Sequence, residues 1–507
     1  MSPLPGEKAL PNALPHTTAT QVPLRRLQRS MDARHLIMIA LGGVIGSGLF
    51  LSSGYTISQA GPLGAIIAYL IGALVVYLVM ACLGELATAY PVSGAFHIYA
   101  ARSIGPATGF TTAWLYWLCW VVALGSEFTA AGILMQRWFP GVPVWVWCLV
   151  FAAVLFTINA ISARVFGETE FWFSLIKVVA IVALIVLGGA AIFGFTPLSS
   201  THPGAVLFSN FETPHGLFPG GVGGVLMTSL AVFYAFSGSE LIGVAAGETK
   251  DPGRNIPRAL RSTVLRLLVL FVGSITVIAA ILPYDKATVT SSPFVDVFAY
   301  AGVPFAPDIM NFVIITALLS AGNSGLFSCA RMLFSLAEEG HAPRSFARLT
   351  RRGIPIVALS VSMALGLVSL LSSVIAAETV YLALVSIAGF AVVAVWMSIV
   401  ASQFFHRRAF LRRGGDLSTL PYRTPLFPIL PIVAFVLLLV SVIAIAFDPN
   451  QVAALYFGLP FVGLCYLFFW WRYGRRGAKA AVQVSEEAPV ESAEDPAAEE
   501  PIAGQKR

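Results

Sequence analysis

Long apolar stretches constrain the fold of this chain more than any other feature. A helix that crosses a bilayer needs about 20 mainly apolar residues. Only 11% of the residues are charged and the mean hydropathy is +0.82, so a water-soluble fold would expose enough apolar surface to aggregate. Charges, prolines and glycines divide the chain into twelve such stretches. We therefore expect an all-α membrane protein with twelve transmembrane helices, near 34–55, 63–89, 108–136, 143–161, 169–193, 222–248, 260–283, 308–336, 355–374, 378–403, 426–447 and 450–472.

The basic residues predict how these spans are oriented. Cytoplasmic loops of membrane proteins carry an excess of Lys and Arg. With both termini in the cytoplasm, every Lys and Arg lies on the inner side except Arg137 and Lys286. The net charge of +6 therefore reflects topology and indicates no nucleic-acid partner. Residues 1–30 and 474–507 lack large apolar faces and are expected to be disordered cytoplasmic tails around a membrane domain at 31–473.

Motifs of enzymes and metal sites do not occur in the sequence. It contains no HExxH, GxSxG or GxxxxGK[ST] pattern, the seven histidines are scattered, and the five cysteines lie far apart in apolar segments. These patterns would indicate a metalloprotease, a serine hydrolase or a nucleotide-driven pump. We therefore expect no enzymatic activity, no metal and no cofactor, and any pumping must use an ion gradient.

Two spans carry residues that interrupt a helix near the middle of the membrane. Span 1 contains Gly42–Gly48, with four glycines in seven residues, and span 6 contains Ser237, Gly238 and Ser239 followed by Glu240. Glycine costs about 1 kcal/mol in a helix, and backbone groups freed in lipid must face a cavity or a ligand. Matching interruptions in two halves indicate a transport site that binds an anionic and a cationic group, as in an amino acid. The alternative is that the glycines only allow close helix packing.

Four ionisable side chains fall in or near the membrane, where a charge usually faces a cavity or a partner. Glu127 lies near the middle of span 3 and is interpreted as a substrate or proton group, with a structural hydrogen bond as the alternative. Lys177 in span 5 either acts in transport or extends to the inner interface. Glu240 is interpreted as having a mixed role, in which it relays a proton and ties the interrupted helix to its neighbours. Glu85, near the inner end of span 2, is interpreted as an interfacial hydrogen-bond partner.

Several motifs resemble the amino-acid permeases of the amino acid–polyamine–organocation superfamily over roughly residues 25 to 473. Within that superfamily, 143–148 and 167–174 most resemble bacterial S-methylmethionine permeases. The motifs that carry the family resemblance are Gly43-Val44-Ile45-Gly46-Ser47-Gly48-Leu49-Phe50, Gly84-Glu85-Leu86-Ala87-Thr88-Ala89-Tyr90-Pro91, Phe236-Ser237-Gly238-Ser239-Glu240, Glu248-Thr249-Lys250-Asp251-Pro252-Gly253-Arg254-Asn255-Ile256-Pro257 and Ala330-Arg331-Met332-Leu333-Phe334-Ser335-Leu336-Ala337.

The resemblance implies a LeuT-type fold with two inverted repeats of five spans, near 34–193 and 222–403, and two peripheral helices within 426–472. It implies that amides near Ser47 and Gly48 hold the substrate carboxylate, and that Tyr234 closes over the substrate. It also implies that Lys177 places its ammonium where sodium sits in sodium-coupled relatives. The full set of expected substrate-binding residues is Val44, Ile45, Gly46, Ser47, Gly48, Tyr234, Phe236, Ser237 and Gly238, with Glu127 for selectivity and Lys177 and Glu240 for proton coupling.

The resulting expectation is a secondary transporter that imports an amino acid across a bacterial inner membrane by proton symport, with S-methylmethionine as the first substrate to test. Its partners are then the amino acid, the proton and the lipid bilayer, and the oligomeric state stays open. One alternative is an amino-acid exchanger of the same fold. Another is a transporter-like amino-acid sensor, although tails of about 30 residues are too short for a soluble effector domain.

Overall fold

The computed structural model describes residues 41–91, 96–161, 163–195, 207–214, 216–244, 246, 251–287, 291–300, 305–368 and 373–487. The described residues form helices and connecting segments without a β-strand. The predicted tail at 1–30 lies outside them. At the other end, α17 continues to Glu487 across a kink at Gly474, so the part of the predicted disordered tail that is described is helical.

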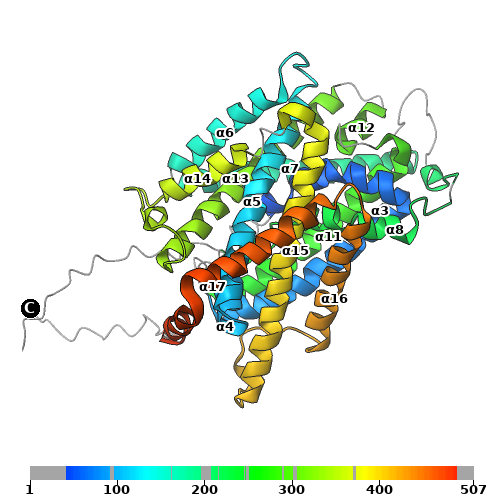
Figure 1. Cartoon of the computed structure of the whole chain (residues 1–507). Coiled ribbons are helices and arrows are strands. Elements are labelled where there is room, and N and C mark those ends of the chain that lie inside the picture. Colours follow the sequence, from blue (N-terminus) through cyan, green and yellow to red (C-terminus); the bar gives the residue numbers. More distant parts are fainter. Residues whose placement is uncertain are drawn as a thin grey trace, which may run out of the picture.

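The α-helices follow one another through the whole described chain (Figure 1). Their bounds are α2 (Ser47–Phe50), α3 (Ser52–Ala89), α4 (Phe96–Ser103), α5 (Pro106–Met135), α6 (Val144–Ile161), α7 (Ala163–Ile192), α8 (Gly221–Met227), α9 (Ser229–Phe236), α10 (Leu241–Val244), α11 (Pro252–Ile281), α12 (Pro293–Tyr300), α13 (Ala306–Glu338), α14 (Ile356–Val368), α15 (Ser373–Arg412), α16 (Ile429–Ala444) and α17 (Ala453–Glu487). Short 3-10 helices are η1 (Ser209–Phe211), η3 (Tyr284–Lys286), η4 (Arg344–Ala347), η6 (Leu417–Thr419) and η7 (Ile445–Phe447).

Ten of the described helical segments, rather than the predicted twelve, are long and apolar enough to cross a membrane. Predicted spans 1 and 2 share one element because α3 combines two helices, which meet where Gly61, at φ 76° and ψ 177°, is not helical and precedes Pro62. Proline removes a helical hydrogen bond and so favours a kink at this point. Span 9 appears as α14, which has only 13 residues within the described part.

Helix α5 lies at the centre of the bundle and α17 lies at its edge. Of the most apolar segment of each, 89% of α5 is buried in the protein but only 22% of α17. Helix α5 packs against α13 and α15, and α3 packs against α11. Figure 1 shows α5 running through the middle of the molecule, with α17 crossing in front of it. Span 3 (α5) and span 8 (α13) therefore meet in the interior, where α2 of span 1 packs against α9 of span 6 and against α5.

Candidate functional site

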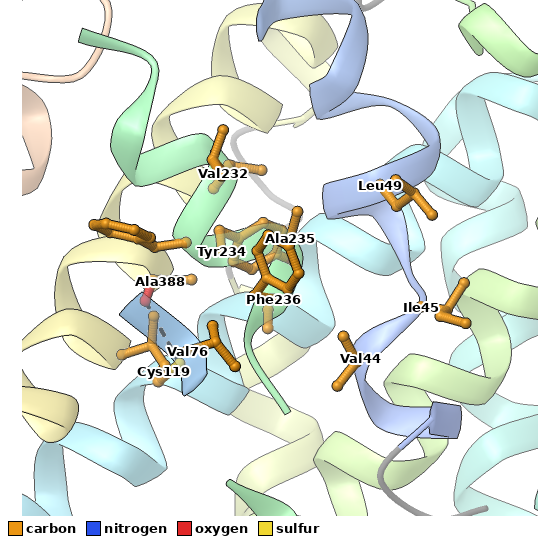
Figure 2. Packing of buried hydrophobic residues seen from close by; sticks show 14 of the residues in the cluster. Val44, Ile45, Leu49, Val76, Cys119, Val232, Tyr234, Ala235, Phe236 and Ala388 are labelled. Carbon is orange, nitrogen blue, oxygen red and sulfur yellow. Dashed lines mark hydrogen bonds between the residues drawn. The ribbon is translucent and has the colours of Figure 1, made fainter. Parts of the chain in front are cut away.

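The helix of span 1 is interrupted between Val44 and Ser47. Ile45 and Gly46 are not helical, Gly46 has an extended backbone at φ −137° and ψ −151°, and the helix begins again as α2. Figure 2 shows this thin segment beside the end of α9. The interruption that the four glycines predict is therefore present, and it leaves the main-chain N–H of Ser47 free to bond outside its own helix.

The helix of span 6 is interrupted as well. Helix α9 ends at Phe236 and α10 begins at Leu241. Gly238, between them, has φ +97°, and a Cβ at this residue would lie 2.8 Å from the carbonyl carbon and oxygen of Gly43. Both the left-handed backbone and the close approach of span 1 require a glycine here. The two interruptions thus contact each other through their main chains.

Glu127 fills the space between the two interruptions. Its buried carboxylate accepts hydrogen bonds from the Ser47 amide at 3.0 Å and the Ser47 hydroxyl at 2.8 Å. The Tyr234 hydroxyl donates to the same carboxylate at 3.2 Å. The structure thus brings three predicted residues together. The Ser47 amide, expected to hold a substrate carboxylate, is bound here by a carboxylate of the protein itself.

Two further side chains of this cluster have no place in the sequence-based prediction. The Tyr381 hydroxyl on α15 donates to the Ser47 carbonyl at 3.0 Å and contacts the Ser52 hydroxyl at 2.9 Å. Ser126 on α5 contacts the Tyr234 hydroxyl at 2.7 Å. Buried polar groups are satisfied by such contacts. A polar residue beside Glu127, and a tyrosine near the start of span 10, are the only sequence signals that could have indicated them.

Lys177 is buried against the first half of the span 1 interruption. Its ammonium donates to the carbonyls of Gly42 at 2.6 Å and Ile45 at 3.1 Å, and to the Ser320 hydroxyl at 2.9 Å. These acceptors come from spans 1 and 8. The side chain therefore does not extend to the interface, which was the alternative, and its charge lies among carbonyls that the broken helix exposes.

The sequence-based prediction also missed Glu170, a charged residue near Lys177. It lies on α7 seven residues before Lys177 and is buried. Its carboxylate accepts from the Ser320 hydroxyl at 2.5 Å and from the Asn323 amide at 3.3 Å. Ser320 thus bridges Glu170 and Lys177. Residues seven apart on a helix share one face, so this spacing was the available signal.

Both Glu170 and Glu127 are close enough to interact electrostatically with Lys177. Asn159 on α6 extends the polar chain by donating to the Asn323 side chain at 2.7 Å. The network therefore joins spans 1, 3, 4, 5, 6 and 8 around one lysine. Such buried networks specify one arrangement when all their members are satisfied.

Glu240 ties the span 6 interruption to its neighbours. Its carboxylate accepts from the Gly238 amide at 3.0 Å, from the Tyr116 hydroxyl at 3.3 Å and from the Trp396 indole at 3.2 Å. The last two residues lie on α5 and α15. This geometry fits the second part of the mixed role expected for Glu240, in which it holds the broken helix in place.

Metal ligands are not gathered in the described residues, which include no group of three or more His, Cys, Asp or Glu side chains able to hold an ion. The five cysteines are buried and free. The polar groups described at this site are main-chain amides and carbonyls, hydroxyls, side-chain amides, the Trp396 indole, the Lys177 ammonium and the carboxylates of Glu127, Glu170 and Glu240.

The comparisons with known proteins agree with one another. The family model described as amino acid permease matches residues 35–481. An amino-acid permease of Bacillus subtilis (strain 168) is 53% identical over 443 residues, which are 87% of this chain and 94% of the relative. The lysine-specific permease of Escherichia coli (strain K12) is 41% identical over 473 residues, 90% of this chain and 95% of the relative.

A histidine permease of Lactococcus lactis subsp. cremoris (strain MG1363) is 38% identical over 466 residues, 89% of this chain and 96% of the relative. These relatives are matched along nearly their whole length, so the likeness covers a complete transporter and not a shared segment. The chain therefore belongs to the amino acid permease family of the amino acid–polyamine–organocation superfamily, and it is a multi-pass membrane transporter of amino acids and not an enzyme.

Proposed function

We propose that the protein imports an amino acid with a positively charged side chain, together with a proton. The observation that carries the proposal is the position of the Lys177 ammonium, which lies between the Gly42 and Ile45 carbonyls of span 1 and the Ser320 hydroxyl of span 8. A permanent cation would hold these two spans together at all times. Loss of its proton weakens the contact of Lys177 with both spans, because a neutral amine has no charge and only two N–H donors for these three acceptors.

The proposed cycle follows from this contact. When the site is open to the outside, Lys177 carries its proton and keeps the first half of span 1 against spans 5 and 8. When the site opens inwards, loss of the proton weakens the hydrogen bonds to the Gly42 and Ile45 carbonyls, spans 1 and 8 separate more easily, and substrate and proton leave on the same side. A ligand shifts such an equilibrium only by its different affinity for the two states.

The proposed substrate contacts use the same interruptions. The amides near Ser47 and Gly48 take the substrate carboxylate, the carbonyls near Val44 and Phe236 take its ammonium group, and Tyr234 closes over it. Ile45, Gly46, Ser237 and Gly238 shape the same backbone. Because Glu127 occupies the Ser47 amide in this structure, the arriving carboxylate displaces it, and Glu127 is then available to a cationic substrate side chain. Two relatives are permeases for lysine and histidine, and S-methylmethionine carries a sulfonium cation, so these three are the substrates to test first.

The proposed membrane arrangement is the one expected from the sequence. Two inverted repeats of five spans surround the site, α16 and α17 are peripheral, and both termini lie in the cytoplasm of a bacterium whose inner membrane holds residues 31–473. The burial of α5 and the exposure of α17 support this arrangement.

The experiment compares two lysine variants in proteoliposomes with an imposed inward proton gradient. Lys177→Met should abolish uphill uptake but keep some counterflow, because substrate exchange does not need the proton to leave. Lys286→Met changes an exposed lysine and should behave like the unchanged protein. Uphill uptake by Lys177→Met at the unchanged rate would refute proton symport. A strict need for internal substrate in all three proteins would favour an exchanger, and binding without flux in all three would favour a sensor.

A further inference from the structure

Two hollows lie along one face of α15 near its C-terminal end. The residues that line them recur at positions 400, 401, 404, 405, 408, 409 and 412. This three-and-four spacing places them in a single stripe on the helix. Phe405, which is 45% exposed, lines both hollows, so the two are neighbours. Neither hollow is part of the site between spans 1 and 6.

The first hollow lies between α15 and α16 and has a volume of about 240 Å³. Every residue that lines it is apolar, including Ala401 and Phe404 from α15 and Ile432 and Val436 from α16. A hollow lined only by apolar side chains offers water no hydrogen-bond partner. An apolar chain in this hollow would pack against two helices, α15 and α16, instead of one.

The second hollow lies between the end of α4 and the last turns of α15 and has a volume of about 390 Å³. Arg408, Arg412 and Arg413 line it together with Ser103 and Ala409. In the described part of the chain, none of these three arginines forms an ion pair within 4.0 Å. The nearest acid along the chain, Asp416, is engaged with the Ser418 amide at 2.8 Å. The hollow is therefore strongly positive and lacks a counter-ion from the protein.

We infer that one anionic phospholipid binds across both hollows, with its phosphate among the three arginines and an acyl chain in the groove between α15 and α16. Guanidinium groups bind phosphate oxygens in pairs, and basic pockets between membrane helices bind lipid headgroups. The apolar hollow directly beside the basic one is what distinguishes a lipid from a free phosphate, which needs no apolar neighbour. The basic residues at a helix end also interact favourably with the helix dipole, but that effect does not account for an adjoining groove.

The bound lipid would join three elements, because α4, α15 and α16 all contribute to the two hollows. The face of α15 that is buried in the protein carries Arg407, whose guanidinium donates a hydrogen bond to Glu85 of α3. The site thus lies outside a segment that is already fixed on its inner side. The inference concerns membrane composition and does not depend on which amino acid is carried or on proton coupling.

The experiment measures how many lipids the purified full-length protein retains, by native mass spectrometry, and how much each lipid raises its thermal stability in detergent. Phosphatidylglycerol and phosphatidylcholine with identical acyl chains are compared with inorganic phosphate and glycerol 3-phosphate. Phosphatidylglycerol should bind more tightly than phosphatidylcholine, and the two chain-free phosphates should have no effect. Equal binding of both lipids, or full stabilisation by inorganic phosphate alone, would overturn the inference.

The variants test the two hollows separately. Arg408→Gln with Arg412→Gln should weaken phosphatidylglycerol binding roughly thirtyfold, given the attraction of each basic residue to anionic lipid. Arg344→Gln with Arg348→Gln, at the first residue of η4 and directly after its end, lies outside the hollows, removes the same charge and should have no such effect. Ala401→Phe keeps every arginine and should still weaken lipid binding by filling the groove, so the test remains decisive if the double arginine variant is unstable. Unchanged phosphatidylglycerol binding in Ala401→Phe, or an equal loss in the η4 control, would contradict a lipid site at this position.

Discussion

Two buried carboxylates of this protein differ in whether a charged side chain donates hydrogen bonds to them. Glu85, at the end of α3, accepts from the Arg407 guanidinium at 2.6 Å, from Gln403 at 3.1 Å and from the Thr424 amide at 2.8 Å. Glu127, between the two interrupted helices, accepts only from neutral groups, which belong to Ser47 and Tyr234. Both side chains are nearly inaccessible, so burial alone does not distinguish their roles.

The difference lies in what each partner allows. Arginine stays charged in proteins, so its hydrogen bonds to the Glu85 carboxylate are charge-assisted, and the pair fixes α3 to α15. The hydroxyl and amide donors around Glu127 tolerate a change in its protonation more easily, because a protonated carboxyl can still accept and donate hydrogen bonds. Glu85 is therefore suited to a fixed contact, and Glu127 to a contact that changes during transport.

The largest effect is expected from Glu85→Gln, which leaves the Arg407 cation buried without its partner. Breaking a buried ion pair in this way costs about 3–5 kcal/mol. The loss should appear as a lower melting temperature of the purified protein, while the order of preferred substrates stays the same. Asp308→Asn breaks the exposed pair with Arg137 and should lower the melting temperature much less, because water screens an exposed ion pair. If the two variants melt at the same temperature, the Glu85 pair is not a structural contact of the kind described.

A second effect, on transport itself, is expected from Glu170→Gln. The carboxylate binds the Ser320 hydroxyl, which in turn accepts from Lys177, so it positions the lysine without touching the substrate. Losing a charged hydrogen bond of this kind should slow proton-driven uptake by about tenfold or more, shift its pH profile and leave counterflow less affected. Glu168→Gln, at an exposed position of the same helix, is the control. An equal fall in uptake and counterflow with no change in pH profile would indicate a purely structural role.

A third effect, on selectivity, is expected from Glu127→Gln. The variant keeps the shape of the side chain but cannot attract a cationic substrate group, so the preference for lysine, histidine or S-methylmethionine over neutral amino acids should fall by about tenfold. Competition uptake measures the ranking directly. An unchanged substrate ranking would show that Glu127 does not determine selectivity. A melting temperature as low as that of Glu85→Gln would show that both carboxylates have the same structural role.

The smallest effect is expected at Glu339, a partly exposed carboxylate just beyond the end of α13. Burial acts to raise its pKa, but the nearby His97 and His341 outweigh this and hold the pKa of Glu339 well below its ordinary value. A carboxylate with a depressed pKa stabilises the folded state fully above its unfolded pKa of about 4.3, and this contribution is lost as the pH falls below that value. Glu339→Gln should therefore melt slightly lower than the unchanged protein at pH 6, and the gap should narrow only as the pH falls below about 4.3. A gap that widens with acid would contradict the assignment.

The features of the fold that could be predicted from the sequence are those written in local residue types. Four glycines between Gly42 and Gly48 cannot easily continue a helix, and Ser237 and Gly238 have the same effect in span 6; both interruptions are present. The boundary between spans 1 and 2 lies where the sequence places it, because the non-helical Gly61 before Pro62 separates the two helices that make up α3.

The partners in the site could not be predicted in the same way. Glu170 lies near the predicted start of span 5, where a carboxylate normally faces water, and only its seven-residue distance from Lys177 indicated a shared face. Ser320, Asn323 and Tyr381 are ordinary residues in apolar helices, and their importance depends on which helices pack together. Pairing between distant spans is a property of the tertiary fold, which no single stretch of sequence contains.

The most direct test of the central claim, that a protonated Lys177 couples amino-acid movement to protons, is the reversal potential of transport in proteoliposomes. Substrate flux is measured at a fixed amino-acid gradient while the opposing proton gradient is varied. Our account predicts that net flux stops at a proton gradient set by a fixed proton-to-substrate ratio, and that Lys177→Met moves substrate only down its own gradient. A net flux that runs down the fixed amino-acid gradient at every proton gradient, without stopping or reversing, would contradict it.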